Sequence, residues 1–493
     1  MSYTRKLVHG AGIVLLLSAL AGLVTYILRI VLARNLGPAD YGLFYSVFTF
    51  IIFFLFFRDL GLGAALVKYV AEWKVQEQYD KIKTAIVSVF VVQLLSSVVF
   101  AIIMFFLAGP LAEHYFKDPR SALIIQILLL YLLFSIFFIT LKQVFLGLQE
   151  TFIYGSFELV KNSLTLVLVF LLLKGGWNVF APVIAYTAVC LILVVIYLPI
   201  FLRKFPFFQY KILHYKSISQ QLLQFGLPVL ATTVGGKVIG YIDTLFLTYF
   251  RSLTEVGVYN VILPSALIFL DLGTTLGIIL LPMTSELWAK GDYRRLEAGV
   301  RLLHRYLLAL VIPLLIIPLV YADLFIGLLF GPEYLSGSLA FQILVVGVLL
   351  CIVGSVNGSI LSGIGQPKKV TKIVLLAAAV NVIVNMLLIP RYGINGAAIA
   401  TSLSYGILLV LSTFTLTRHF HIPFPVKEWG KLLLAGTGFL LVILVIKTML
   451  NFNPWLIMLI SIVPAVVVYL LLLYLLNIVS LPEIKRYLRL VLS

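Results

Sequence analysis

Six charged side chains lie deep inside long apolar segments of the sequence. They are Arg29, Arg58, Asp59, Lys237, Asp243 and Asp271. Each costs at least about 2.5–3.5 kcal/mol at the centre of a membrane helix, so these side chains should face protein or water. The three cations are suited to pairing with an anionic group, arginine by paired hydrogen bonds. The alternative is that they form interhelical ion pairs that only hold the protein together.

The three aspartates are candidates for ion coupling. Asp59 and Asp271 occupy matching positions near the cytoplasmic ends of two predicted helices, and either could bind a proton or Na⁺. The alternative for these two is a pair with a loop lysine, Lys68 or Lys290. When ionised, Asp59, Asp243 and Asp271 could together compensate the charge of the three cations while an empty cavity resets.

Small and polar residues recur every three or four positions around two of the cations, so they share one helix face. One such face carries Ser18, Gly22, Thr25, Arg29 and Ala33, and a second carries Thr233, Lys237, Gly240 and Thr244. A third polar face carries Asn381 and Asn385. These faces suit the wall of a water-filled cavity, although polar faces also serve as contacts between membrane helices.

The elements that position these residues are membrane helices. The chain has 493 residues, of which 62% are hydrophobic and only 11% charged, and its mean hydropathy is +1.13. Soluble domains carry about 25% charged residues, so this composition excludes a soluble enzyme, a coiled coil and a disordered chain. We therefore expect an all-α polytopic membrane protein in which Cys190 and Cys351 are small buried hydrophobes.

Fourteen segments are long and apolar enough to span a bilayer. They are residues 9–33, 41–67, 84–108, 121–141, 155–173, 179–202, 222–249, 257–281, 302–322, 336–361, 371–389, 395–417, 431–450 and 455–477. With the N-terminus inside, the external Lys and Arg are Arg34, Lys117, Arg120, Lys174, Arg251, Arg391 and Lys447. Most of the 36 basic residues then lie on the cytoplasmic side, which predicts that both termini are cytoplasmic. This orientation explains the net charge of +17 without nucleic acid.

An internal repeat divides the predicted helices into two sets of six. Tyr26 aligns with Tyr241 and Gly42 with Gly257 at a constant offset of 215 residues, and Asp59 aligns with Asp271 after a small gap. An even number of helices gives both copies the same orientation, so an axis along the membrane normal must relate them. We expect two six-helix lobes, residues 1–202 and 222–417, joined by a cytoplasmic linker, 203–221, and followed by two further helices and a tail, 418–493. Such lobes suit alternating access.

Signatures of catalysis are absent from the sequence. It contains no phosphate-binding Gly-x-x-x-x-Gly-Lys-Ser/Thr motif, no His-Glu-x-x-His, and no paired-cysteine or acidic cluster that would hold a metal. We expect no enzyme activity, no catalytic residue, no metal site and no cofactor.

Several short motifs carry a family resemblance. They are Arg34-Asn35-Leu36-Gly37-Pro38-Ala39-Asp40-Tyr41-Gly42, Gly331-Pro332-Glu333-Tyr334, Gly365-Gln366-Pro367 and Tyr392-Gly393-Ile394-Asn395-Gly396-Ala397-Ala398. The first resembles the N-terminal signature of polysaccharide-biosynthesis membrane proteins, in particular the O-antigen-type flippases of the multidrug/oligosaccharidyl-lipid/polysaccharide (MOP) exporter superfamily. The resemblance extends over the whole chain in length, helix number and repeat.

This resemblance implies translocation of an undecaprenyl- or dolichyl-diphosphate oligosaccharide across the cytoplasmic membrane. The diphosphate would pair with Arg29, Arg58 and Lys237, the lipid tail would stay in the bilayer, and enzymes of glycan assembly would be partners. Lipid II flippases are the nearest sister function. A cation-coupled multidrug antiporter of the same superfamily is the rival hypothesis, but it would want an acidic residue in the first helix, where this chain has Arg29. A non-transporting scaffold would leave the charged interior unexplained.

Overall fold

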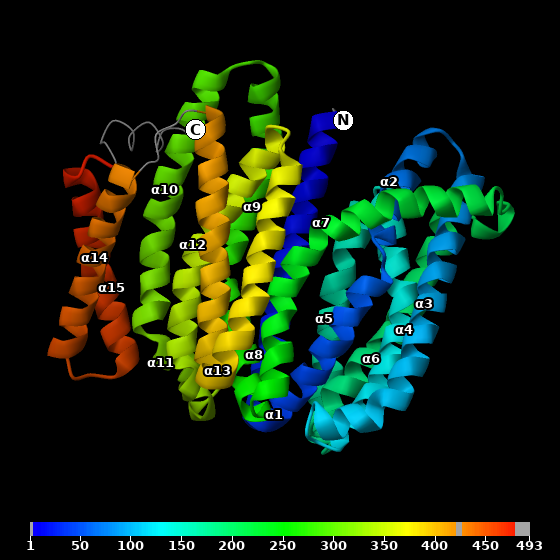
Figure 1. The fold of residues 1–493 in the computed structure, drawn as a ribbon, viewed down its shortest axis with the longest axis horizontal. Helices are drawn as coiled ribbons and strands as arrows, with labels where there is room; N and C mark the ends of the chain where they lie inside the picture. Colours follow the sequence, from blue (N-terminus) through cyan, green and yellow to red (C-terminus); the bar gives the residue numbers. More distant parts are fainter. Residues whose placement is uncertain (1–2, 421–425, 479–493) are drawn as a thin grey trace. The chain divides into compact units, whose positions relative to one another are not determined.

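The computed structural model describes residues 3–420 and 426–478. The side chains of residues 3–11, 271, 272, 274, 275, 278, 279, 419, 420 and 426 lie outside that description. Within the described residues the protein is built from α-helices and two short 3₁₀ turns (Figure 1), which confirms the all-α prediction. The chain falls into two compact units, Met1–Asn260 and Val261–Ser493.

Helix α1 (Tyr3–Arg58) opens the first unit and bends at one residue. Gly37 interrupts it with φ 70° and ψ 170°, a left-handed conformation that glycine adopts without steric cost, and Pro38 starts the second half. Just beyond the bend, Asp40 pairs with Arg120 at 2.9 Å. The predicted break between the first two apolar segments is therefore present, and it separates two straight helices of one continuous chain.

A second break separates α1 from α2 (Leu62–Val75), in the middle of an apolar segment. Leu60 and Gly61 have φ of 49° and 71°, and a side chain at Gly61 would overlap the carbonyl oxygen of Gly226 in α7. The position therefore requires glycine both for its conformation and for this close approach. The break places Asp59 in a turn, where its carboxylate accepts a hydrogen bond from the side chain of Gln93 at 2.7 Å.

The remaining helices of the first unit pack around these two. They are α3 (Tyr79–His114), α4 (Arg120–Gly147), α5 (Thr151–Lys174), α6 (Phe180–Lys204) and α7 (Tyr215–Phe250). Helix α5 runs along α1, α4 packs against both α3 and α6, and α7 contacts α1, α2 and α3 (Figure 1). The segment between α6 and α7 is held on the start of α3, where the backbone N–H of Lys211 donates to Asp80 at 2.7 Å.

Two glycines of the internal repeat lie directly against each other in the first unit. A Cβ at Gly42 in α1 would overlap the carbonyl oxygen of Leu253 at the start of α8 (Leu253–Leu267), and a Cβ at Gly257 would overlap the carbonyl oxygen of Pro38. Pro38 and Leu253 are separated by the same offset as the two glycines. The contact is therefore reciprocal, as a contact about a twofold axis is.

The second unit contains the rest of α8 and the helices that follow. They are α9 (Leu270–Ala289), α10 (Tyr293–Val320), α11 (Ala322–Leu329), α12 (Ser338–Gly363), α13 (Pro367–Phe420), α14 (Val426–Met449) and α15 (Pro454–Leu475). Helix α12 packs against α9, α10 and α13. Helix α13 bends at Gly393, with φ 54° and ψ −131°.

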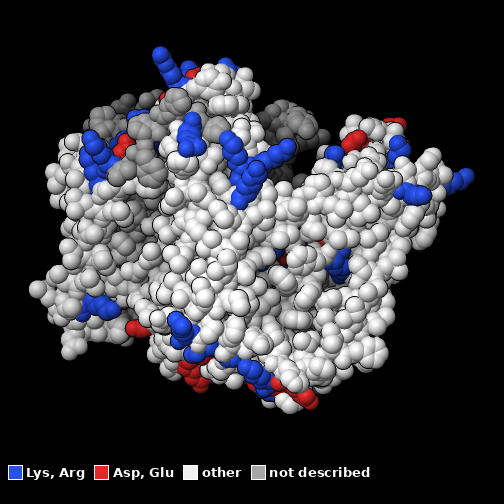
Figure 2. Space-filling model, viewed as in Figure 1, with Lys and Arg blue, Asp and Glu red and all other residues white. Residues whose placement is uncertain are grey.

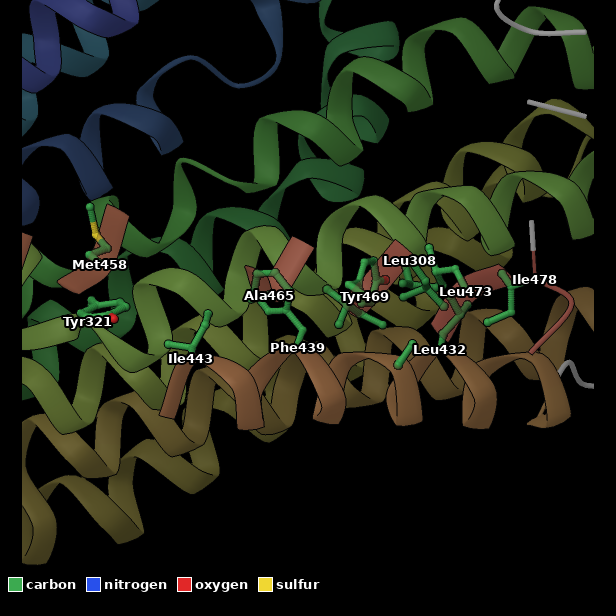
Figure 3. Packing of buried hydrophobic residues seen from close by; sticks show 13 residues of the cluster. Leu308, Tyr321, Leu432, Phe439, Ile443, Met458, Ala465, Tyr469, Leu473 and Ile478 are labelled. Carbon is green, nitrogen blue, oxygen red and sulfur yellow. The ribbon is translucent and has the colours of Figure 1, made fainter. Parts of the chain in front are cut away.

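The last two helices belong to the same core as α10. Leu308 of α10, Phe439 of α14 and Tyr469 of α15 are buried together (Figure 3), and the Tyr469 hydroxyl donates to the carbonyl oxygen of Ala309 at 2.9 Å. Buried apolar area and a satisfied tyrosine hydroxyl together fix these helices against α10.

Eleven helices in the described part of the chain are long and apolar enough to cross a membrane. Two of them, α1 and α13, contain the bends at Gly37 and Gly393, and α8 and α9 together cover the segment 257–281 where one crossing is predicted. In Figure 2 the charged side chains gather towards the helix ends, and a broad, mostly uncharged band separates them. Both cysteines are free and buried, as predicted.

Candidate functional site

Arg29 lies on α1 in a cluster of tyrosines. Its guanidinium carbon is 4.9 Å from the centre of the Tyr45 ring, and the hydroxyls of Tyr41 and Tyr186 are close enough to interact with its charge. One guanidinium nitrogen donates to the backbone carbonyl of Asn260 at 3.2 Å. The residue is half-buried, and these contacts orient its side chain. An arginine held in this way keeps a donor fork for an anion.

Thr244 supports the residue that holds Arg29. The amide nitrogen of the Asn260 side chain donates to the Thr244 hydroxyl at 3.2 Å and to the backbone carbonyl of Val256 at 2.9 Å. Both Thr244 and Asn260 are buried. The sequence predicts Thr244 at a cavity wall. In the structure Thr244 is buried and contacts the side chain of Asn260, the residue whose backbone carbonyl binds Arg29.

Lys237 projects from α7 on an exposed face that also carries Thr233 and Gly240. Its ammonium nitrogen lies 5.9 Å from the ring centre of Phe56 and 5.8 Å from that of Tyr241. Arg29 and Lys237, which are 208 positions apart in sequence (29 to 237), thus both stand among aromatic side chains of the first unit.

Arg58 is placed differently from the other two cations. Its side chain is buried, and one guanidinium nitrogen donates to the carbonyl oxygen of Leu132 at 2.8 Å and to the Ser135 hydroxyl at 3.2 Å, with Ser97 at 3.5 Å. These partners belong to α3 and α4. In this conformation Arg58 ties three helices of the first unit together, and the predicted grouping with Arg29 and Lys237 does not appear among its contacts.

Asp59 and Asp243 each have hydrogen-bond partners of their own in the first unit. Asp59 is bonded to Gln93 and lies near the backbone N–H of Gly63, 3.4 Å away. Asp243 is buried, and its carboxylate accepts a hydrogen bond from the Tyr259 hydroxyl. Asp271 falls on α9, and its side chain is outside the described part of the structure. Ion coupling through these residues stays a prediction.

Some residues of the predicted polar faces are exposed and others are buried. Ser18 and Thr233 are exposed. Thr25 accepts a hydrogen bond from Asn162 of α5 at 2.6 Å, so it joins α1 to α5. In α13, Asn381 and Asn385 are fully buried; Asn385 donates to Asn381 at 3.2 Å, and Asn381 donates to Thr401, beyond the bend, at 3.4 Å. These three side chains hold helix segments together in this conformation.

A charged cavity in the first unit was missed by sequence reasoning. It has a volume of about 380 Å³ and lies between α2, α4 and α5, with Gln143 and Tyr154 among its lining residues. Lys142 pairs with Glu158 at 2.6 Å, and Lys161 pairs with the other oxygen of the same carboxylate. Two lysines and one glutamate leave one net positive charge. Lys142, Glu158 and Lys161 are not among the predicted site residues, although the Glu158-to-Lys161 spacing inside an apolar segment was a usable signal.

These groups are chemically suited to an anion with polar substituents. Arg29 and Lys237 could supply positive charge to a phosphate or diphosphate, and their neighbouring aromatic rings restrict where the charges lie. The cavity around Lys142 and Lys161 supplies hydrogen-bond donors and acceptors of the kind that hydroxyl-rich groups need. The described residues contain no group of three or more histidine, cysteine, aspartate or glutamate side chains placed to hold a metal ion.

Comparison with solved structures defines the class of fold. The lipid II flippase MurJ in an inward closed conformation superposes with a TM-score of 0.75 at 17% identity, over 93% of this chain and 97% of that one. A multidrug resistance MATE family transporter of the MOP superfamily, in an inward-facing conformation, gives a TM-score of 0.66 at 15% identity, over 81% and 94% of the two chains. The protein is thus a polytopic membrane protein with the fold of MOP-superfamily transporters.

Sequence comparison gives the family. The family of polysaccharide biosynthesis proteins matches residues 7–288. The uncharacterized membrane protein MJ1068 of Methanocaldococcus jannaschii is 32% identical over 465 residues, which is 92% of each chain. The probable low-salt glycan biosynthesis flippase Agl15 of Haloferax volcanii is 25% identical over 226 residues, 45% of this chain and 48% of that one. The chain belongs to the polysaccharide biosynthesis protein family, which confirms the predicted family resemblance.

Proposed function

We propose that this protein is a flippase that moves a polyprenyl-diphosphate-linked oligosaccharide across the cytoplasmic membrane by alternating access. The observation that carries the proposal is that Arg29 and Lys237 both lie among aromatic side chains of the first unit, Arg29 over Tyr45 and Lys237 near Tyr241, because a diphosphate needs fixed positive charge in order to leave water. The charged cavity around Lys142 and Lys161 would receive part of the oligosaccharide. The lipid tail would remain in the bilayer, and glycan-assembly enzymes would deliver the substrate.

Within this proposal the chain crosses the membrane fourteen times. The bends at Gly37 and Gly393 would each separate two crossings, and α8 with α9 would form one more. Residues 1–202 and 222–417 would form the two lobes, with 203–221 as the linker and 418–493 as the appended region. The reciprocal contact of Gly42 and Gly257 supports a pseudo-twofold relation between the repeats.

We expect cysteines introduced near Lys74, Lys211 and Lys427 to react with a membrane-impermeant thiol reagent only from the cytoplasmic side. The basis is the bias of Lys and Arg towards one side of the predicted helices. The measurement compares labelling of intact cells with labelling of inside-out vesicles, in a background that lacks Cys190 and Cys351. A cysteine near Lys174, on the predicted external side, is the control and should show the reverse pattern. Reaction of any of the three in intact cells contradicts the topology.

A cation-coupled multidrug antiporter is the second candidate, because the MATE family transporter has the same fold. A lipid II flippase is a closer alternative, because MurJ has the fold as well. Purified protein in proteoliposomes separates the three. We expect movement of a fluorescent diphosphate-linked oligosaccharide, and no accumulation of a cationic dye under an imposed proton or Na⁺ gradient. Dye accumulation without oligosaccharide movement would favour the antiporter, and movement of lipid II alone would favour its flippase.

A further inference from the structure

His304 is a buried histidine on α10 whose two ring nitrogens both have partners. Nδ1 lies 2.8 Å from the backbone carbonyl oxygen of Val300, one helical turn earlier. Nε2 lies 2.6 Å from the side-chain oxygen of Asn357 on α12. Because a carbonyl oxygen can only accept, Nδ1 must carry a hydrogen. The protonation of the ring is therefore decided at Nε2, and Nε2 faces Asn357.

Asn357 connects the His304 ring to α13 through hydrogen bonds. Its amide nitrogen donates to the Thr413 hydroxyl at 2.9 Å and lies 3.3 Å from the Ser412 hydroxyl, both in the second half of α13. These hydroxyls in turn donate to the backbone carbonyl of Leu409, at 2.7 Å and 3.1 Å. With the Asn357 amide in this orientation, its side-chain oxygen faces Nε2. The ring and the amide are both satisfied only if Nε2 also carries a hydrogen and donates it to that oxygen. This arrangement is that of the charged imidazolium ring.

Loss of the Nε2 proton reverses this set of bonds. A neutral ring with its hydrogen on Nδ1 needs a donor at Nε2, which Asn357 can supply only by turning its amide. The amide oxygen would then face the hydroxyls of Ser412 and Thr413, and a hydroxyl that donates to it must leave the Leu409 carbonyl. One proton at His304 thus decides how α12 is bonded to α13.

The site borders a small cavity and has a defined electrostatic surrounding. A small cavity of about 40 Å³ borders His304 and Asn357, large enough for a water molecule. Arg301 of α10 and Trp429 of α14 line the same cavity, while Arg305 and Glu428 line a larger cavity of about 310 Å³ that shares Arg301. The side chains that α12 and α13 contribute, Asn357, Thr413 and Thr417 among them, do not titrate.

We propose that His304 is a proton-binding site of the second unit, at which binding of a proton to Nε2 turns Asn357 and exchanges the hydrogen bonds between α12 and α13. The incoming proton comes from water and returns to water, so no other reactant is needed. Histidine is the side chain that ordinarily changes charge between pH 5 and 8, which suits it to a proton-driven step. Any effect on transport rests on the proposed flippase function; the proton site itself does not.

The test is a pH titration of ¹⁵N-histidine in the full-length protein in lipid nanodiscs, with the His304 signal assigned by its loss in His304→Gln. We expect a neutral form with hydrogen on Nδ1 that changes to the doubly protonated form as the pH falls. Asn357→Asp should raise the midpoint by about 1–3 pH units, because the carboxylate stabilises the imidazolium. Asn357→Leu should lower the midpoint, because the buried charge loses its acceptor. Both variants must show the elution profile of the intact protein.

His114 is the matched control. Its Nδ1 makes the same bond to a carbonyl one turn earlier, that of Pro110, at 3.1 Å, but the residue is exposed on α3 in the other unit. The His114 signal should not move in either Asn357 variant. A His304 signal that stays neutral between pH 5 and 8, or a midpoint that neither Asn357 variant moves, overturns the proposal.

A transport measurement then links the site to function. If His304 binds the coupling proton, the flipping rate of the wild type should depend on pH, approaching a tenfold change per pH unit at most, and His304→Gln should remove that dependence. His114→Gln should leave it intact. If the titration behaves as expected while no variant or wild-type protein moves the oligosaccharide, the proton site stands and the flippase assignment fails.

Discussion

Replacing Lys237 with alanine is expected to lower the rate of oligosaccharide flipping by about 10–150-fold, the equivalent of about 1.5–3 kcal/mol for a hydrogen bond to a charged group. The protein should still fold, because the Lys237 side chain is exposed and its ammonium group lies against the rings of Phe56 and Tyr241. The measurement is the initial rate in proteoliposomes, normalised to reconstituted protein. Lys174→Ala is the matched control, since Lys174 is also exposed and lies 4.5 Å from the Phe170 ring at the end of α5.

Arg29→Ala should reduce flipping at least as strongly. This variant also loses the hydrogen bond to the carbonyl of Asn260, so a modest loss of thermal stability should accompany it. Arg29→Lys should recover expression and part of the rate, because lysine keeps the charge but not the paired donors of the guanidinium. If Arg29→Ala abolishes expression and Arg29→Lys is no better, Arg29 is a structural residue and the diphosphate assignment is wrong.

Gly42→Ala and Gly257→Ala should each impair folding, with a loss of about 1–3 kcal/mol or more in the free energy of unfolding. A methyl group at either position would overlap a backbone carbonyl oxygen, that of Leu253 or that of Pro38, and backbone cannot move aside as a flexible side chain can. The measurement is the yield of monodisperse protein and its thermal midpoint in detergent. Gly109→Ala in α3 is the control, since a Cβ there meets no atom within 4 Å.

Combining Gly42→Ala with Gly257→Ala tests whether the two contacts depend on each other. Moving the start of α8 away from α1 would relieve both overlaps at once, so the two substitutions should cost less together than the sum of their separate effects. Strictly additive losses would show that the two contacts are independent, and full yield of both single variants would show that the helices do not approach so closely.

The sequence by itself determined the fold class and the family. Apolar segments of about twenty residues can satisfy their backbone hydrogen bonds in a bilayer only as helices, so length and composition are sufficient to predict an all-α membrane protein. The bends at Gly37 and Gly393 were equally predictable. Gly37-Pro38 and Tyr392-Gly393 influence the backbone conformation at their own positions, so no contact with a distant segment is needed. The family follows from motifs that are contiguous in sequence.

Only the folded structure shows which neighbours surround the intramembrane charges it describes. Arg29 and Arg58 both stand in apolar segments of α1, yet Arg29 lies over the Tyr45 ring and donates to the Asn260 carbonyl, whereas the guanidinium of Arg58 donates to Leu132 and Ser135. A helix face can be inferred from spacing, but which neighbour covers that face depends on packing between segments far apart in the chain. For the same reason the pairing of Lys142 with Glu158, and the contact of His304 with Asn357, were not predictable: each joins two helices.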